Sequence, residues 1–540
     1  MNNFNNKLKR FNEFLISKQQ ISKLLFWIGI LFISSYLRFA NLAENPGWYS
    51  DEGTMVEIAK NLLEGRIQYL AINQSTLLVA KMPLFPALLA GVFSFFEPGI
   101  TTLRYVTASL GVITTGMLYW VVKDISESES TYLGFTAAFL YAIYPQAILY
   151  SRLGFSYNLL SPLIVGILWF LWKYLDSSRK KWILLASLLV GVGSISDLMM
   201  ITLVPAIVLI ALSKSWKDAL SGIGIMILPF LVYSASMLSI NREAFSFDFR
   251  FTFFRLGEIP LIAQYPIVIM NFAAIIFKNY WWNLAVIGLF LLNQRRFRAL
   301  MLVIFFTPLI LLARTTLLAD LGFYYISPLF PLIAIGSASL LIVGIPHVLT
   351  IIRQDLESFV DNLKRMINIR KLETVWSPLI FIISSLLLLL IVFSPIIITL
   401  SLDVDQAQSG LKTEIDSLLV DVHDAKNVIT FVNERVNEND IVLASPAIAW
   451  AFNSKSADFQ MSVAYEGGET KHFPIDIPSE RFEFNPELSN ATYVVIDPIW
   501  RNWAMPNMPE VETMVQNIEK WPKIYYSGQI DVYENPAKVK

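Results

Sequence analysis

Two adjacent carboxylates, Asp51 and Glu52, follow the first long apolar segment of the chain and are its most suggestive chemical groups. That segment, Ile21 to Ala40, can cross roughly 30 Å of hydrocarbon as a helix that rises about 1.5 Å per residue. Both carboxylates therefore fall where a first spanning helix leaves the membrane. Apolar side chains at helical spacing in residues 53–64 predict a second helix, along the interface, that ends at Gly65. The alternative to a chemical role is that Asp51 caps this helix.

The composition indicates a polytopic membrane protein. Hydrophobic residues make up 55% of the 540 residues, charged residues make up 16%, and the mean hydropathy is +0.53. Such values are typical of chains that cross a bilayer many times. The absence of cysteine excludes a disulfide framework and a thiol nucleophile, and three scattered histidines do not suggest a zinc cluster. The net charge of -1 gives no indication of a nucleic-acid partner.

Apolar runs predict a polytopic helical membrane protein with about eleven spanning helices. The segment Pro83 to Phe96 is interpreted as an interfacial or re-entrant helix because it is short and carries two prolines near its start. After Ile21–Ala40, the expected spans are Thr102–Val122, Tyr132–Tyr150, Leu159–Trp172, Trp182–Ile195, Met199–Leu212, Ile223–Leu238, Trp282–Leu292, Ala299–Leu312, Tyr325–Ile345 and Ser377–Leu400.

Basic residues predict the orientation. The tail, residues 1–20, carries several lysines and arginines, as do the loops near residues 173–181, 214–217, 295–298 and 347–376. By the positive-inside rule these segments are cytoplasmic, so we expect an integral protein of the cell membrane with a cytoplasmic N-terminus. The membrane domain would span residues 21–400, with residues 41–101 as its first outer loop.

Residues 401–540 differ in composition and predict a small extracytoplasmic α/β domain that covers the outer cleft and helps to select the acceptor. The sequence favours helices at Leu411–Val436 and Val511–Lys520, strands at Asp440–Ala444 and Thr492–Asp497, and a hairpin at Lys523–Tyr533.

Four further polar residues fall on the outer side in this topology, and we expect them to face Asp51 and Glu52. Lys81 begins the segment Lys-Met-Pro-Leu-Phe-Pro, Arg152 and Asn158 lie in one loop, and Asp197 lies in another. A lysine or arginine at headgroup depth can bind a phosphate, but it can also simply reach lipid headgroups.

These motifs resemble the GT-C glycosyltransferases. The early Asp-Glu pair, the interfacial helix that ends at Gly65, the Lys81 segment and the loop with Arg152 occur here in the order typical of that family. The branch of protein O-mannosyltransferases and the lipid A aminoarabinose transferase is the most similar, over roughly residues 21–240.

The resemblance implies a sugar donor linked to polyprenyl phosphate, and transfer with inversion to a glycan, protein or lipid acceptor on the outer face. Asp51 would be the general base. Lys81 would neutralise the donor phosphate, and Arg152 and Arg314 would also bind it. Asn158 and Asp197 would contact the substrate. Glu52 would orient the acceptor or help to hold a divalent cation, although two adjacent carboxylates do not establish a metal site.

Three positions depart from the family pattern. Asn158 stands where a second acidic residue is expected, and an amide cannot act as a base. Asp197 stands where relatives commonly have a basic residue, so it is either a local substitute or a solvated loop carboxylate. The late arginine of the family is missing from Phe323-Tyr324-Tyr325, so Arg314, or alternatively Arg250 or Arg255, would supply that charge.

Two other functions remain open from the sequence. A lipid or glycan transporter would need polar or broken helices near the bilayer midplane, and often paired halves. A catalytically silent relative of the GT-C enzymes is the other alternative, because of the departures at Asn158 and at the late arginine.

Overall fold

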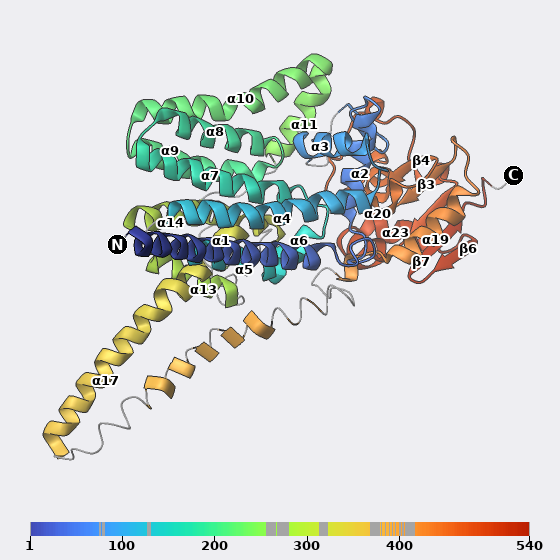
Figure 1. Ribbon diagram of the computed structural model, residues 1–540. Coiled ribbons are helices and arrows are strands. Elements are labelled where there is room, and N and C mark those ends of the chain that lie inside the picture. The colour runs from blue at the N-terminus through green and yellow to red at the C-terminus, as the bar shows by residue number, and fades with distance from the viewer. Residues whose placement is uncertain are drawn as a thin grey trace.

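A computed structural model of the chain describes residues 2–74, 77, 81–126, 131–254, 266, 270, 280–312, 322–367 and 416–538, together with scattered positions between 379 and 404. Figure 1 shows a bundle of long helices with the C-terminal strands gathered at one end of it, opposite the N-terminus.

Long apolar helices form the bundle, as the hydropathy predicts. Within the described residues, five helices are long and apolar enough to cross a membrane, or six if the bent pair at 132–151 is one span. The helices of the bundle are α1 (Asn2–Phe39), α4 (Ile100–Ile125), α5 (Thr131–Ile143), α6 (Pro145–Ser151), α7 (Tyr157–Ser177), α8 (Lys180–Ser194), η2 (Leu198–Leu203), α9 (Val204–Leu212), α10 (Trp216–Ile240), α13 (Tyr280–Leu291), α14 (Arg295–Leu312), η4 (Gly322–Leu329), α16 (Phe330–Ser339), η5 (Leu340–Gly344) and α17 (Ile345–Ile367).

The predicted spans differ from these helices mainly in length. Helices at 198–212 and 282–291 are shorter than the roughly 20 residues that a bilayer requires, and α8 is shorter as well. The helix at 132–151 bends by 60° at Tyr144, just before Pro145, because a proline cannot donate the hydrogen bond that would continue the helix. The expected span Ser377–Leu400 is described only at scattered positions, and these are helical.

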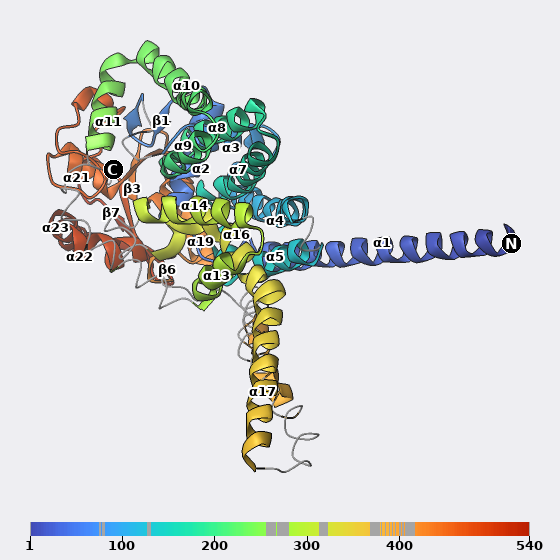
Figure 2. The same cartoon turned by 90° about the vertical axis from the view of Figure 1, so that its left-hand side faces the viewer.

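The first loop contains α2 (Ser50–Leu63), a short antiparallel pair of β1 (Gln68–Tyr69) and β2 (Ile72–Asn73), and α3 (Leu84–Phe93). The interfacial helix predicted over residues 53–64 is therefore α2, and the predicted helix at Pro83–Phe96 is α3. After α10 the chain forms α11 (Arg242–Phe254), which lies next to β1 in Figure 2 and forms an ion pair with Arg481 of the C-terminal region.

The C-terminal region is a mixed five-stranded sheet with helices. Its strand order is β4-β3-β5-β7-β6, with β3 parallel to β4 and β5, and β7 antiparallel to β5 and β6. Successive residues of β3 and β5 are buried, which requires that both faces of the sheet be covered. The strands are β3 (Ile441–Ala444), β4 (Lys455–Asp458), β5 (Tyr493–Ile496), β6 (Lys523–Ser527) and β7 (Ile530–Glu534), and the helices are α19 (Val422–Asn433), α20 (Pro446–Ala449), α21 (Phe459–Tyr465), η9 (Trp500–Ala504), α22 (Met505–Asn507) and α23 (Pro509–Ile518), with short helical turns η6 (Asp416–Leu418), η7 (Ser479–Arg481) and η8 (Leu488–Asn490).

Sequence patterns correctly predicted two strands, β3 and β5, the β6–β7 hairpin and the helix α23. They missed β4 and α21. The predicted helix over Leu411–Val436 is only partly present, as α19, and residues 411–415 lie outside the described part.

The C-terminal region shares one hydrophobic core with the first loop. Buried side chains of α2, β1, β2 and α3 belong to the same cluster as those of the five-stranded sheet. Trp48 pairs with Val420 as an isolated antiparallel bridge, and α20 packs on α2. The two segments that a sequence reading separates into an outer loop and a C-terminal domain are thus packed as one body.

Candidate functional site

The helix α2 presents its first two acidic residues to different surroundings. Asp51 is 34% exposed in its side chain, whereas the side chain of Glu52 is 0% exposed. Adjacent residues on an α-helix point about 100° apart, so two consecutive carboxylates cannot face the same surroundings. The Asp-Glu pair is therefore two separate features of the site.

Glu52 is fully occupied by contacts within the protein. Its Oε1 accepts from Arg104 Nε at 2.7 Å and from the Gly154 amide at 2.9 Å, while its Oε2 accepts from Arg104 Nη2 at 2.6 Å and from the Tyr49 amide at 3.0 Å. Arg104 also donates to the Pro46 carbonyl at 2.6 Å. These bonds fix the loop before α2 to α4, and they leave Glu52 without the exposure that an acceptor or a metal ion would need.

Arg152 and Asn158 are likewise turned toward backbone carbonyls. Arg152 is buried and donates to the carbonyls of Leu37, Ala40 and Asn45 at 2.9, 2.7 and 2.9 Å. The amide nitrogen of Asn158 donates to three carbonyls, those of Tyr150, Leu153 and Phe155. A carboxylate at position 158 could not make these three bonds, because it has no donor. Asn158, which departs from the family pattern, therefore stabilises the turn between α6 and α7 through hydrogen bonds to its backbone.

Three buried guanidinium groups lie near one another, and two of them donate to carbonyls of the loop that precedes α2. Arg38, Arg104 and Arg152 are each 0% exposed. Arg38 donates to the Tyr141 and Ala142 carbonyls at the end of α5. Burial, with the nearby charges of Arg104 and Arg38, lowers the pKa of Arg152 to about 10, so it remains protonated at neutral pH.

Asp51, Lys81 and Asp197 form the partly exposed portion of the site. The Lys81 Nζ lies 3.1 Å from Asp51 Oδ1. Asp197 accepts from the Ser156 hydroxyl at 3.1 Å and from the Met199 amide at 3.0 Å, where it caps η2. Two segments of the first loop and a third segment more than 100 residues further along the sequence thus bring two carboxylates and one ammonium group together at one end of the bundle.

Burial, together with a smaller effect of the negative charge of Asp51, raises the pKa of Asp197 to about 6, although the charge of Lys81 and the hydrogen bonds from Met199 and Ser156 oppose this increase. Asp197 is partly buried, so it is not the freely solvated loop carboxylate that was one of its two interpretations. Its charge interactions with both Asp51 and Lys81 make it a member of the candidate site.

The remaining candidates have different outcomes. Arg314 and the alternative Arg255 lie outside the described residues, whereas Arg250 is exposed on α11. Within the described part of the chain, no group of three or more histidine, aspartate or glutamate side chains could hold a metal ion. Sequence reasoning missed Arg104 and Ser156. The signal for Arg104 was available, since a charged residue in an apolar spanning helix commonly has a partner and a role.

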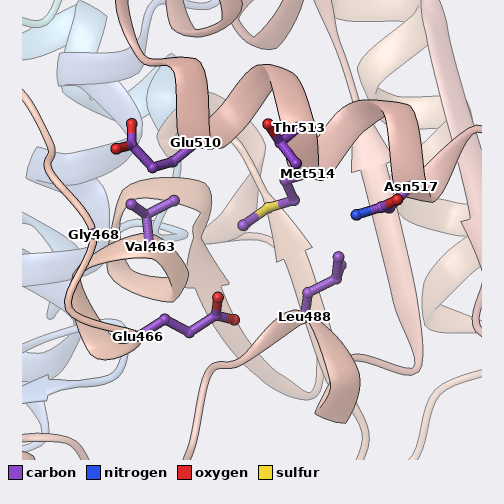
Figure 3. A pocket seen from close by; sticks show the side chains of 8 residues that line it. All are labelled: Val463, Glu466, Gly468, Leu488, Glu510, Thr513, Met514 and Asn517. Atoms are coloured by element: carbon purple, nitrogen blue, oxygen red, sulfur yellow. The ribbon is translucent and has the colours of Figure 1, made fainter.

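A separate hollow of about 230 Å³ lies in the C-terminal region, between α21 and α23 (Figure 3). Its floor includes Val463 and Met514, and the carboxylates of Glu466 and Glu510 lie along its margin. None of the residues of the candidate site lines it.

The fold and part of the sequence are similar to known proteins. Residues 80–240 match a family model described as dolichyl-phosphate-mannose-protein mannosyltransferase. The crystal structure of ArnT from Cupriavidus metallidurans in the apo state superposes with a TM-score of 0.62 at 12% identity, covering 97% of this chain and 99% of ArnT. The structure of ArnT bound to undecaprenyl phosphate gives 0.56 at 13% identity, with the same coverage.

The chain has the fold of the GT-C glycosyltransferases. A third similar structure is the archaeal oligosaccharyltransferase AglB from Archaeoglobus fulgidus, in complex with an inhibitory peptide and a dolichol-phosphate, with a TM-score of 0.50, 14% identity, and coverage of 97% of this chain and 75% of AglB. No curated protein matches the sequence. In this GT-C chain, the segment that matches the family model includes Lys81, Arg104, Arg152 and Asp197 but begins after Asp51.

Proposed function

We propose that this GT-C chain is a membrane glycosyltransferase that transfers a sugar from a polyprenyl-phosphate-linked donor to an acceptor hydroxyl on the extracytoplasmic face. The observation that carries the proposal is the Asp51–Lys81 pair, 3.1 Å apart, at the end of the bundle where the C-terminal region lies. ArnT, whose fold is similar, has been crystallised with undecaprenyl phosphate. A lipid phosphate lies at headgroup depth, within reach of a loop at the end of a spanning helix.

In the proposed reaction, Asp51 accepts the proton of the acceptor hydroxyl as its oxygen attacks the anomeric carbon. The bond between that carbon and the phosphate oxygen breaks, and the electron pair leaves with the polyprenyl phosphate. A single displacement inverts the anomeric configuration. Lys81 stabilises the negative charge of the departing phosphate as a point charge. When the donor phosphate binds the ammonium group of Lys81, Asp51 loses its ion pair with Lys81 and can act as the base.

The other site residues have supporting roles in this proposal. Glu52 with Arg104, and Arg152 with Asn158, hold the loops that carry Asp51 and its neighbours, because their hydrogen bonds run to backbone groups of those loops. The three buried guanidinium groups add positive potential, which favours an anionic donor at this end of the bundle. Asp197 holds Lys81 from a second direction. Arg314 remains a candidate for a further contact with the donor phosphate.

Asp51→Asn is expected to abolish sugar transfer from a polyprenyl-phosphate donor at normal expression, because an amide cannot accept the proton. Glu64→Gln is the matched control, since Glu64 is an exposed carboxylate just after the same helix. Full transfer by the Asp51→Asn variant would refute the assignment of the base.

Lys81→Ala is expected to raise the KM for the donor more than the KM for the acceptor, with Arg66→Ala, an exposed cation of the same loop, as control. An unchanged KM for the donor would remove the phosphate role.

The orientation is tested separately. We propose that the N-terminus and the basic loops are cytoplasmic and that Asp51 and the C-terminal region are extracytoplasmic. Because the chain contains no cysteine, a single Glu64→Cys substitution provides a unique label at the C-terminal end of α2, the helix that begins beside Asp51. A membrane-impermeant thiol reagent should label this variant in intact cells. Labelling only after the cells are broken would place the site on the wrong face for the proposed donor.

A further inference from the structure

A buried ion pair joins the C-terminal region to α11. Arg481 donates from Nη1 to Asp248 Oδ1 at 2.9 Å and from Nη2 to Asp248 Oδ2 at 3.0 Å. The side chains are 4% and 0% exposed. The third nitrogen of the same guanidinium, Nε, donates to the Asn73 carbonyl at the end of β2 at 3.0 Å. One arginine therefore holds two segments, α11 and the β1–β2 pair, that are widely separated in the sequence.

The neighbours of Arg481 reinforce the contact with β1 and β2. Phe482 forms an isolated bridge with Ile72, and the Glu483 amide donates to the Ala71 carbonyl at 2.8 Å. The Glu483 carboxylate also accepts from the side-chain amide of Gln68. The segment 481–483 thus pairs with the first loop along its backbone, while the Arg481 side chain reaches over to α11. Figure 2 shows α11 and β1 beside each other at this place.

Of the two segments that Arg481 joins, α11 contacts the part of the chain that leads to Lys81, and the β1–β2 pair precedes that part in the sequence. The Thr252 hydroxyl of α11 donates to the Leu77 carbonyl at 2.9 Å. Leu77 and Met82 are packed in one small apolar cluster with Met237 of α10 and Phe245 of α11. Lys81 lies between the two residues of this segment that the cluster buries. Described residues on both sides of Lys81 are therefore held in a cluster that includes α11, and the β1–β2 pair ends a few residues before them in the sequence.

We infer that Arg481 is a positioning residue that sets where Lys81 stands relative to Asp51, through Asp248 and the Asn73 carbonyl. This inference rests on the proposed function for its effect on the donor. It also assigns a task to the C-terminal region beyond covering the cleft or selecting an acceptor. The planar guanidinium group of arginine suits this task, because its N–H groups point in fixed directions and so define both the distance and the angle between the two segments. The flexible ammonium group of a lysine would not fix them.

The first test measures geometry without any substrate. Gln74 and Asn241 are exposed and hydrogen-bonded to each other, and they bridge the end of the β1–β2 pair and the start of α11. In this cysteine-free chain, Gln74→Cys with Asn241→Cys should cross-link efficiently through a short bis-thiol reagent. Adding Arg481→Met should reduce the cross-linking yield severalfold, because the two segments then lose their common anchor.

Arg435→Met is the matched control, since Arg435 belongs to the same region but forms an exposed ion pair with Glu434. It should leave the cross-linking yield unchanged. If Arg481→Met does not accumulate, Arg481→Lys carries the test, because it keeps a positive charge beside Asp248 and removes only the fork. An unchanged cross-linking yield in whichever Arg481 variant folds would overturn the inference that Arg481 anchors α11 to the β1–β2 pair. This outcome does not depend on whether the wild-type chain transfers sugar.

The second test measures the consequence for the site. Arg481→Met should raise the KM for the donor about tenfold while the KM for the acceptor changes less than twofold, and Arg481→Lys should give an intermediate value. A purely structural role would instead lower the amount of active protein and leave both KM values in place. A lowered cross-linking yield with an unchanged donor KM would overturn the link from Arg481 to Lys81.

Discussion

The pair Asp51 and Glu52 allows a sharp prediction, because the two neighbouring carboxylates should respond in opposite ways to loss of charge. Glu52→Gln leaves the guanidinium of Arg104 buried without its counter-charge. Breaking one partner of a buried ion pair typically costs ~3–5 kcal/mol. Asp51 is 34% exposed and its ion pair with Lys81 is partly solvated, so Asp51→Asn should change the free energy of unfolding by less than ~1 kcal/mol.

The assay compares both variants in the same detergent. Thermal unfolding followed by tryptophan fluorescence should show a clear decrease in Tm for Glu52→Gln and almost none for Asp51→Asn. Sugar transfer per folded molecule should be lost in Asp51→Asn. In Glu52→Gln it should survive in the fraction that folds. A Glu52→Gln protein with wild-type Tm and no transfer would refute the reasoning, since Glu52 would then take part in the reaction itself.

Three further predictions concern other sites. Asp197→Asn should remove an acidic limb near pH 6 from the pH profile of donor use, because the raised pKa means that the wild-type carboxylate beside Lys81 is neutralised below that pH; a profile identical to wild type would argue against it. Burial raises the pKa of Asp458 from 3.8 to about 6, so the folded protein binds this proton more tightly than the unfolded chain does. Its contribution to stability is therefore greatest below pH 4 and falls by about 2–3 kcal/mol as the pH rises through 6. Asn is as good an N-cap as Asp, so Asp458→Asn should flatten the dependence of Tm on pH between 4 and 6, whereas Asp421→Asn, at an exposed N-cap, should not. A Cβ at Gly53 would lie 1.9 Å from a backbone carbonyl oxygen of α20, so Gly53→Ala should lower both Tm and transfer; Gly91→Ala, where a Cβ meets nothing within 4 Å, should change neither.

The sequence alone predicted the long helices and the meeting of the Asp51 and Lys81 segments. Hydropathy determines which segments cross a bilayer, and the order of the spans determines which loops meet. This is why the prediction that Lys81 faces Asp51 agrees with their 3.1 Å separation. Short helices such as α8 and α9 were expected as full spans, because apolar composition does not reveal where a helix starts or ends.

The roles of individual polar residues were less predictable. Arg152 was expected to bind a donor phosphate, and it instead donates to three backbone carbonyls. Carbonyl groups are present at every position, so a sequence does not show which of them will face a given guanidinium. The burial of Glu52 depends on Arg104, which is more than 50 positions away, and only the packing of α4 against the first loop brings them together.

The common core of the first loop and the C-terminal sheet has a consequence for how the protein is made. Lys60 on the Asp51 helix and Trp450 are bonded across 390 positions, so α2 emerges from the ribosome long before its packing partner exists. The apolar face of α2 therefore remains unpacked until the spanning helices that precede the C-terminal region have been synthesised. The proposed site, although encoded near the N-terminus, becomes complete only late in biosynthesis, and truncation in the C-terminal sheet should inactivate it as surely as a change at Asp51.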